Sequence, residues 1–226
     1  MPAGILLLNM FKSEETRSKI LDAALDLFRE RGFDAATMRE IAARAGVATG
    51  LAYYYFKSKE DLVLAFYWRA KDEMARQLEN AHTEHRKLEG RLRALIQAKL
   101  DYFNPNRKFL AALIGFAADP KSPLSPFGEQ TREIRDADVA QFDRALRETN
   151  TNVPKDLAPH LARMLWLYQL GQIFYWLYDD SPGQRRAQAL LDKSMKVVLL
   201  LIKLSSLPLM RPARRMVVEL IEVIES

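Results

Sequence analysis

The sequence contains no cysteine, which excludes disulfide bridges and thiolate metal sites. It also lacks a long hydrophobic run: residues 197–204 are too few to span a bilayer, and Lys203 interrupts them. The apolar residues Ile5 to Leu8 follow no basic segment and precede no clear cleavage site, which argues against a secretory signal. We therefore expect a soluble, cytoplasmic protein with no membrane partner, in which residues 1–10 form a flexible lead-in.

The motifs of the common enzyme classes are missing as well. No G-x-G-x-x-G, P-loop, G-x-S-x-G or H-E-x-x-H pattern occurs. The nearest approach to a metal site is the pair His82 and His85, whose spacing allows them to share one ion. They stand in a polar stretch near a helix end, which favours a solvated face instead. We expect no enzyme activity, no cofactor and no metal.

The positive charge of the chain is not concentrated in residues 1–60. The formal net charge of +5 suits a polyanionic partner. Residues 1–60, however, hold nine Lys or Arg against eight Asp or Glu, which leaves a net charge of only +1. Any inference of DNA binding must therefore come from the spacing of residues.

That spacing occurs within residues 37–60, where a glycine separates two short helix signals. Thr37 followed by Glu40 is a capping box and predicts a helix start. Gly46 supplies the left-handed residue that ends this helix, and a second helix begins within about three residues. Ser58 and Asp61 repeat the capping pattern, so a further helix should start at Ser58. The arrangement is typical of a helix-turn-helix, whose second helix enters the DNA major groove.

An upstream helix and a shared apolar core complete this small head. The upstream helix carries a buried stripe at helical spacing and ends at Gly32; the stripe is Ile20, Ala24, Leu27 and Phe28. The residues available for the core of the three helices are Ile41, Ala45, Val47, Leu51 and Tyr55.

Residues 17–62 resemble the DNA-binding head of the tetracycline-repressor (TetR) family of bacterial regulators. The resemblance rests on an ordered string of motifs: Ile41-Ala42, Ala45-Gly46-Val47, Gly50, Tyr53, Tyr55-Phe56 and Ser58-Lys59-Glu60. One position departs from the family, which usually has serine or threonine where Ala48 begins the recognition helix. A missing cap of this kind typically costs about 1 kcal/mol.

The resemblance also implies which residues contact DNA. Arg39 matches a position from which family members reach guanine, although a solvated surface arginine is an equal alternative. Thr49 and Tyr54 are the candidates for base edges, while Tyr53, Lys59 and the Gly50 backbone match positions near the phosphates. Thr37 and Ser58 add helix N-termini, which favour phosphate oxygens. Tyr55 and Phe56 are assigned to the core rather than to the DNA-facing side.

Beyond Ser58 the pattern predicts helix after helix, near residues 58–80, 84–103, 106–118, 127–149, 155–179, 183–205 and 212–225. Residues 157–178 are apolar on nearly every side, which indicates burial all round. The next helix offers Leu190, Leu191, Met195, Val198, Leu199 and Ile202 at helical spacing. We expect these two helices to form half of a four-helix homodimer interface, as the resemblance also implies; the alternative is a monomer core.

The aromatic residues of this body predict a small-molecule site. An apolar pocket with a few convergent polar groups is what such a site needs. The candidate lining is Phe103, Phe116, Met164, Tyr168, Gln169, Gln172, Tyr175 and Trp176. An ordinary core, with the glutamines in solvent or paired across the dimer, is the alternative. We expect an apolar or aromatic ligand without a strong anion, because no buried arginine or lysine is evident.

Together these inferences predict an all-α regulator with a three-helix DNA-binding head at residues 1–57 and a helical ligand-binding and dimerisation body at 58–226. It should be a homodimeric repressor that an unknown small-molecule effector releases from a palindromic double-stranded operator. The competing hypothesis is a helical small-molecule or lipid-binding protein without specific operator recognition.

Overall fold

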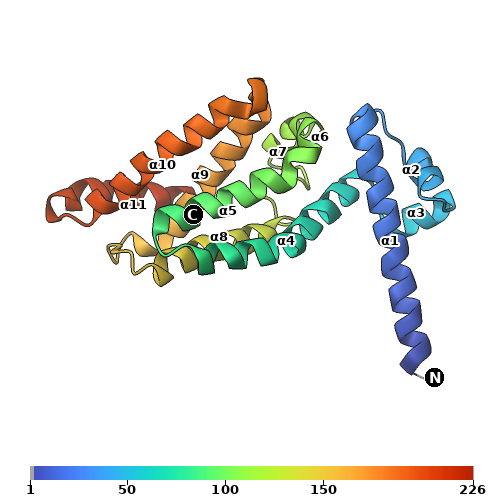
Figure 1. Ribbon diagram of the computed structural model, residues 1–226, viewed down its shortest axis with the longest axis horizontal. Coiled ribbons are helices and arrows are strands. Elements are labelled where there is room, and N and C mark those ends of the chain that lie inside the picture. The colour runs from blue at the N-terminus through green and yellow to red at the C-terminus, as the bar shows by residue number, and fades with distance from the viewer. Residues whose placement is uncertain (1–2, 226) are drawn as a thin grey trace. The chain divides into compact units, whose positions relative to one another are not determined.

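The chain folds into helices joined by turns and short 3₁₀ segments, which confirms the expected all-α fold (Figure 1). The computed structural model describes the backbone of residues 3–225 and the side chains of residues 11–221, and this range contains no strand. None of the helices described there is long and apolar enough to cross a membrane. In chain order the helices are α1 (Ala3–Arg31), α2 (Met38–Arg44), α3 (Thr49–Tyr55), α4 (Lys59–Glu84), α5 (Leu88–Phe103), η1 (Asn104–Asn106), α6 (Arg107–Ala112), α7 (Ile114–Ala118), α8 (Arg132–Glu148), α9 (Ala158–Tyr178), η2 (Pro182–Gln184), α10 (Arg185–Ser205), η3 (Pro208–Met210) and α11 (Arg211–Glu225).

The helices pack as two compact units. The first contains residues 1–72 and 104–132, and the second contains residues 73–103 and 133–226. The first unit is therefore larger than the expected head at residues 1–57, because α6, α7 and the turns that follow them pack with it. Helix α4 runs from one unit into the other.

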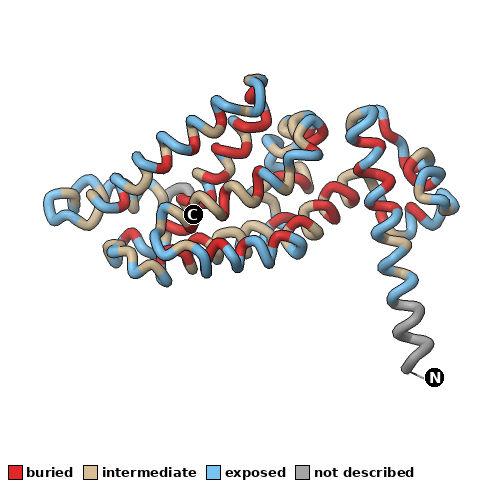
Figure 2. The backbone as a smooth tube through the Cα atoms, in the orientation of Figure 1, coloured by how far each residue is buried: buried red, intermediate tan, exposed pale blue. Residues whose placement is uncertain are grey.

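An aromatic cluster holds the first unit together. The rings of Phe28 on α1 and Phe109 on α6 stack with their centroids 5.0 Å apart, and Phe33 lies 5.3 Å from Phe28. Phe66 on α4 contacts the same cluster at 6.3 Å from Phe109. The predicted stripe of α1 is buried, and Ile20 and Ala24 are fully enclosed. Figure 2 shows the buried positions of α1 in red. Packing against these aromatic rings is what ties α6 to the head.

Several expected helix boundaries are wrong: α4 ends at Glu84 rather than near residue 80, α5 begins at Leu88 rather than near residue 84, and three further differences follow. Helix α1 already begins at Ala3, so residues 3–10 extend a helix instead of forming a flexible lead-in, while residues 1 and 2 of the expected lead-in lie outside the described residues. Helix α8 begins at Arg132 rather than near residue 127, because the Ser125 carbonyl accepts a bond from the Thr131 hydroxyl at 2.6 Å and closes a turn there. The helix expected at 106–118 breaks at Leu113 into α6 and α7.

The core of the second unit is formed where α5, α9 and α10 pack against one another. Three residues of the expected dimer seam on α10 are buried in this core, so their assignment to the seam is wrong: Leu191, Met195 and Ile202. The exposed apolar residues of α10 lie on another face of the helix, at Val197, Leu200 and Leu201.

The second unit also buries polar groups that were expected at the surface. His82 is only 1% exposed, and its Nε2 lies 2.9 Å from the Gln141 Oε1, so the expected solvated face is wrong. Arg91 and Lys99 are buried as well, and they pair with Glu148 and Asp138 respectively. The premise that the body buries no arginine or lysine is therefore wrong, although both of these cations are neutralised locally.

Candidate nucleic-acid interface and body cavity

The capping box at the start of α2 is formed as predicted. The Thr37 hydroxyl accepts from the Glu40 amide at 3.3 Å, and the Thr37 amide donates to the Glu40 carboxylate at 3.0 Å. Hydrogen bonds from the Thr37 hydroxyl and amide lower the pKa of Glu40, which keeps the box ionised at neutral pH. Helix α2 therefore begins at a fixed point beside its neighbours.

The turn between α2 and α3 is a Schellman motif. Gly46 has a φ of +69°, in the left-handed region that favours glycine. The Val47 amide reaches the Ala42 carbonyl at 3.0 Å, and the Gly46 amide reaches the Ala43 carbonyl at 3.2 Å. Two carbonyl groups at the end of α2 are thereby satisfied, and the chain is redirected into α3.

Helix α3 turns four of the predicted contact residues outward. Ala52 and Phe56 are buried on the inner side, whereas Thr49, Gly50, Tyr53 and Tyr54 are exposed on the outer side, Tyr54 at 71%. Leu51 is also exposed, so its assignment to the core is wrong; it lies about 100° around the helix from Ala52. The assignment of Phe56 to the core is confirmed.

The N-terminus of α3 lacks a side-chain cap, as expected from Ala48. Ala48 occupies the N-cap position with extended backbone angles, and no side chain caps the helix there. Tyr55 at the other end is half-buried and meets the Ser13 hydroxyl at 3.1 Å.

Arg39 and Arg44 of α2 differ in the partners of their guanidinium groups. Arg44 makes two hydrogen bonds to the Glu30 carboxylate, at 2.5 and 2.7 Å, and so joins α2 to α1. Arg39 is exposed and has no hydrogen-bond or ion-pair partner among the residues whose side chains are described. Its guanidinium is therefore available to a ligand, while that of Arg44 is engaged.

The start of α4 holds the last two predicted contacts. The Ser58 hydroxyl accepts from the Asp61 amide at 3.2 Å, which confirms the second cap. The Lys59 ammonium donates to the carbonyl oxygens of Phe33 and Asp34, at 2.6 and 3.2 Å. Lys57, which sequence reasoning passed over, is exposed, and its ammonium lies 6.0 Å from the centre of the Tyr54 ring. The only sequence signal for Lys57 is its position directly after the recognition helix α3.

The eight candidate ligand residues do not form one site in the structure. Phe116 belongs to the first unit, where its ring meets Phe33 edge-on at 5.5 Å. The remaining seven belong to the second unit, but Tyr175 is exposed and Trp176 is buried in the core. Two of them, Met164 and Tyr168, line the same cavity.

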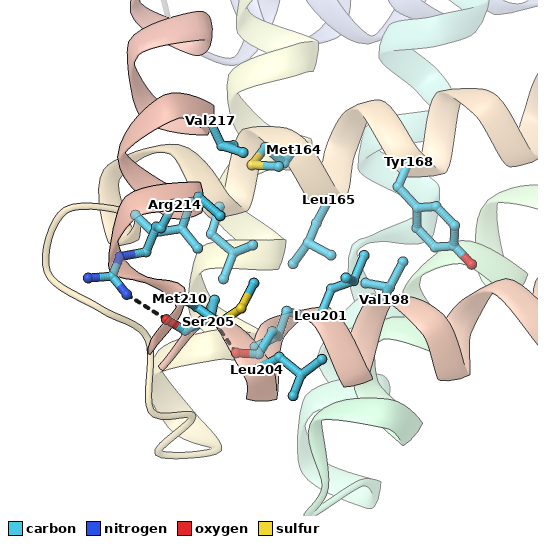
Figure 3. A pocket seen from close by; sticks show the side chains of 14 residues that line it. Met164, Leu165, Tyr168, Val198, Leu201, Leu204, Ser205, Met210, Arg214 and Val217 are labelled. Carbon is cyan, nitrogen blue, oxygen red and sulfur yellow. Dashed lines mark hydrogen bonds between the residues drawn. The ribbon is translucent and has the colours of Figure 1, made fainter. Parts of the chain in front are cut away.

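That cavity, which we call the α9–α11 cavity, has a volume of about 360 Å³ (Figure 3). Its wall is almost entirely aliphatic, with side chains from α9, α10, η3 and α11 such as Leu165, Leu201, Met210 and Val217 respectively. Tyr168 and Arg214 lie at opposite sides of it in Figure 3. Sequence reasoning missed the contribution of α11, although the apolar spacing of Met216, Val217 and Leu220 indicates a helix with one face to pack.

The two glutamines of α9 are treated differently. Gln172 donates to the Ser194 hydroxyl at 3.2 Å, and the same oxygen lies 2.7 Å from the Tyr168 hydroxyl. Gln169 is 3% exposed, and its Nε2 has no hydrogen-bond partner in the described part of the chain. Among the described residues, no group of three or more metal-binding side chains occurs.

Comparison with known proteins matches both parts of the chain. Residues 20–66 match the family described as "Bacterial regulatory proteins, tetR family", and residues 91–220 match "Tetracyclin repressor-like, C-terminal domain". The chain is 30% identical to the transcriptional activator FasR of Mycolicibacterium smegmatis, over 77% of this chain and 78% of that protein. It is 26% identical to the transcriptional repressor BepR of Brucella suis, over 75% and 84% respectively.

A similar fold is found in a solved structure, the transcriptional regulator FadR from Bacillus subtilis in complex with stearoyl-CoA. The TM-score is 0.63 at 20% sequence identity, and the match covers 80% of this chain and 96% of that one.

Proposed function

The chain belongs to the tetracycline-repressor family of bacterial transcriptional regulators, and we propose that it is a homodimeric repressor released from a palindromic operator by a small apolar ligand. The observation that carries the DNA-binding part is the outer face of α3, where Thr49, Gly50, Tyr53 and Tyr54 are exposed. Arg39 on the preceding helix is also exposed and has no hydrogen-bond or ion-pair partner among the described side chains. We propose that the protein acts by binding DNA and ligand rather than by catalysis. We place it in the cytoplasm, where the operator DNA of a bacterium lies.

We divide the proposed DNA contacts into two classes. Arg39, Thr49 and Tyr54 read base edges, because their exposed side chains carry the hydrogen-bond groups that base edges can accept or donate. The second class sets register on the phosphates and comprises Thr37, Gly50, Tyr53, Ser58 and Lys59. Gly50 suits this role because a side chain at this position would meet open space rather than another part of the chain.

The proposed dimer uses exposed apolar stripes on α9 and α10. On α9, Leu167 and Tyr175 are exposed at a spacing of eight residues, with the exposed Gly171 midway between them. On α10, Val197 and Leu200 are more than half exposed. A glycine between large apolar residues lets a second helix approach closely, and a two-fold interface requires one self-complementary patch. This patch replaces the seam expected from Leu191, Met195 and Ile202.

The proposed ligand binds in the α9–α11 cavity, whose volume lies within the range typical of small-molecule sites. Aliphatic side chains dominate its wall, and Tyr168 is the one candidate with an aromatic ring there, so an aliphatic ligand fits better than a flat aromatic one. The structural neighbour FadR was solved with stearoyl-CoA, a ligand with a long aliphatic chain. The ligand must favour the DNA-free arrangement, because equal affinity for both states would release nothing.

Repression is the simpler mode of action. A dimer that covers its operator blocks polymerase without further contacts, whereas activation requires an additional contact with the transcription machinery. The two relatives described above include one named an activator and one named a repressor. Transcription in vitro from a promoter that contains the operator separates these modes.

Footprinting of the purified protein on genomic DNA flanking its gene tests the proposal. We expect protection of two half-sites related by a two-fold axis and spaced by about one helical turn or a multiple of it. The competing hypothesis of a helical small-molecule or lipid-binding protein predicts weak, salt-sensitive binding to all sequences alike. An absence of any protected site at moderate salt would contradict operator recognition.

A further inference from the structure

A second, polar pocket adjoins the α9–α11 cavity, and Arg214 lines both. This basic pocket has a volume of about 380 Å³ and is formed by the segment before α9 and the start of α11. Its charged residues are Lys155, Asp156, Arg211 and Arg214. The apolar cavity therefore borders a pocket that carries three cations against one carboxylate.

Arg214 forms a fixed boundary between the two pockets. Its Nε donates to the Asp156 carboxylate at 2.7 Å, and its Nη1 donates to the Ser205 carbonyl at 2.6 Å. Only 13% of its side chain is exposed. In Figure 3 the guanidinium lies at the edge of the cavity and points away from the aliphatic residues. The aliphatic stem can thus contact an apolar chain while the charged end stays on the polar side.

The other two cations of the basic pocket have no such engagement. Lys155 and Arg211 are both exposed, and neither has a hydrogen-bond or ion-pair partner among the residues whose side chains are described. Asp156 is already neutralised by Arg214, whose hydrogen bond lowers the pKa of that carboxyl group. The net positive charge of the pocket therefore resides on two side chains that are free to bind an anion.

We propose that the effector is an amphipathic molecule with an aliphatic chain in the α9–α11 cavity and an anionic head, a carboxylate or a phosphate, on Lys155 and Arg211. This inference rests on the proposed effector-binding function and narrows the class of ligand. It differs from the expectation of an apolar or aromatic ligand without a strong anion, which assumed that the body buries no arginine or lysine. Because the cations lie at one end of the cavity, they also fix the direction in which the aliphatic chain of the ligand enters it.

Competition binding in the absence of DNA tests this assignment directly. The full-length protein is loaded with the fluorescent fatty acid cis-parinaric acid, which is then displaced by palmitate, by palmitoyl-CoA or by 1-hexadecanol. These competitors share a sixteen-carbon chain and differ in the head, which is a carboxylate, a phosphate-bearing group or an uncharged hydroxyl. We expect at least one of the two anions to bind more tightly than the alcohol.

The double variant Lys155→Ala, Arg211→Ala removes the two free cations. Loss of charged hydrogen bonds should weaken the anionic competitors by about tenfold and leave 1-hexadecanol unchanged. The matched control is Arg86→Ala, Lys87→Ala, which removes the same charge from two exposed residues in the α4–α5 connection. A competitor that weakens only in the first variant identifies its own head, carboxylate or phosphate, as the one recognised. Both pairs are exposed, so folding should be preserved, and thermal unfolding checks that it is.

A third variant tests whether the aliphatic chain of the ligand lies in the α9–α11 cavity. Val198 lines the cavity and is half-buried, so Val198→Trp should fill it and weaken all three competitors together. The inference would be overturned if neither anion bound more tightly than the alcohol, if both double variants showed the same loss, or if no competitor bound. If the ligands bind as expected but never release operator DNA, the ligand class stands and the proposed effector role fails.

Discussion

The Lys59 ammonium donates a hydrogen bond of 2.6 Å to the carbonyl oxygen of Phe33, 26 residues earlier in the chain, and lies 4.5 Å from the centre of the Phe33 ring. It thus ties the start of α4 to the turn between α1 and α2. A residue assigned to a phosphate contact by resemblance therefore also has a structural role, and a mutation must separate the two.

We expect Lys59→Ala to lower the free energy of unfolding by about 1.5 kcal/mol, because two charged hydrogen bonds to carbonyl groups are lost. If Lys59 also contacts a phosphate, affinity should fall equally for all DNA sequences, and the slope of log affinity against log salt should drop by about one. Urea unfolding and binding at several salt concentrations measure these effects. Lys57→Ala is the control for stability, since the Lys57 ammonium makes only a 3.5 Å bond to the Tyr54 carbonyl. If Lys59→Ala left the free energy of unfolding unchanged, the hydrogen bonds from Lys59 would not stabilise the head.

Tyr54→Ala should flatten the preference among operator variants. Tyr54 is 71% exposed on the outer face of α3, so truncation should cost little folding energy while it removes a base contact worth about 1 kcal/mol or more of discrimination. Affinities for a panel of single-base operator variants give the measurement. Tyr54→Phe keeps the ring and removes the hydroxyl, which separates hydrogen bonding from apolar contact. Retention of the full preference in both variants would exclude Tyr54 from the reading surface.

Ala48→Ser should stabilise the head, because the N-cap of α3 has extended backbone angles and lacks a side-chain acceptor. A serine at such a position typically adds about 1 kcal/mol to the free energy of unfolding. Urea unfolding measures the gain, and Ala43→Ser, an exposed position within α2, provides a serine that caps nothing. Equal effects of the two substitutions would show that α3 is already capped by other means.

Leu200→Glu should dissociate the proposed dimer. Leu200 is 53% exposed in the single subunit, so the carboxylate costs little there, but it would be unpaired and desolvated in an apolar interface. Sedimentation velocity should show a folded monomer, with weaker operator binding because one head makes half the contacts. Leu209→Glu, at an 88% exposed position outside the two stripes, should remain dimeric. A dimer of normal size for Leu200→Glu would place the interface elsewhere.

The sequence predicted the local parts of the head well. The Thr37 cap, the Gly46 turn and the Ser58 cap each depend on residues within a few positions of one another, and all three are present in the structure. The boundary of α8 was missed because a serine followed by a proline, as at Ser125-Pro126, suits both a helix cap and a closed turn. The bond from Thr131 decides between them.

Contacts between distant segments were not predictable from one sequence. Nothing near Lys59 indicates that its ammonium would be held by Phe33, and nothing near Met164 indicates that α11 would complete a cavity around it. Apolar periodicity showed that α10 has a buried face, but the packing partners decide which of its apolar residues are buried in the subunit. Leu191 is enclosed, whereas Leu200 is left exposed.

His82 shows the same limitation and carries the last prediction. It stands in a polar stretch, but Gln141, 59 residues later on α8, and Arg91 on α5 enclose its ring. Burial lowers the pKa of His82 despite the hydrogen bond to Gln141, so the folded protein takes up its proton less readily than the unfolded chain. The stability that this neutral histidine contributes is present above the ordinary pKa value of 6.5 and is lost as the pH falls below it.

The free energy of unfolding at fixed protein concentration should therefore decrease from pH 7.5 to 5.5. The paired carboxylates Glu79 and Glu148 have lowered pKa values and stay ionised across this range. His82→Gln should remove that part of the slope, and an unchanged slope in this variant would show that another group titrates.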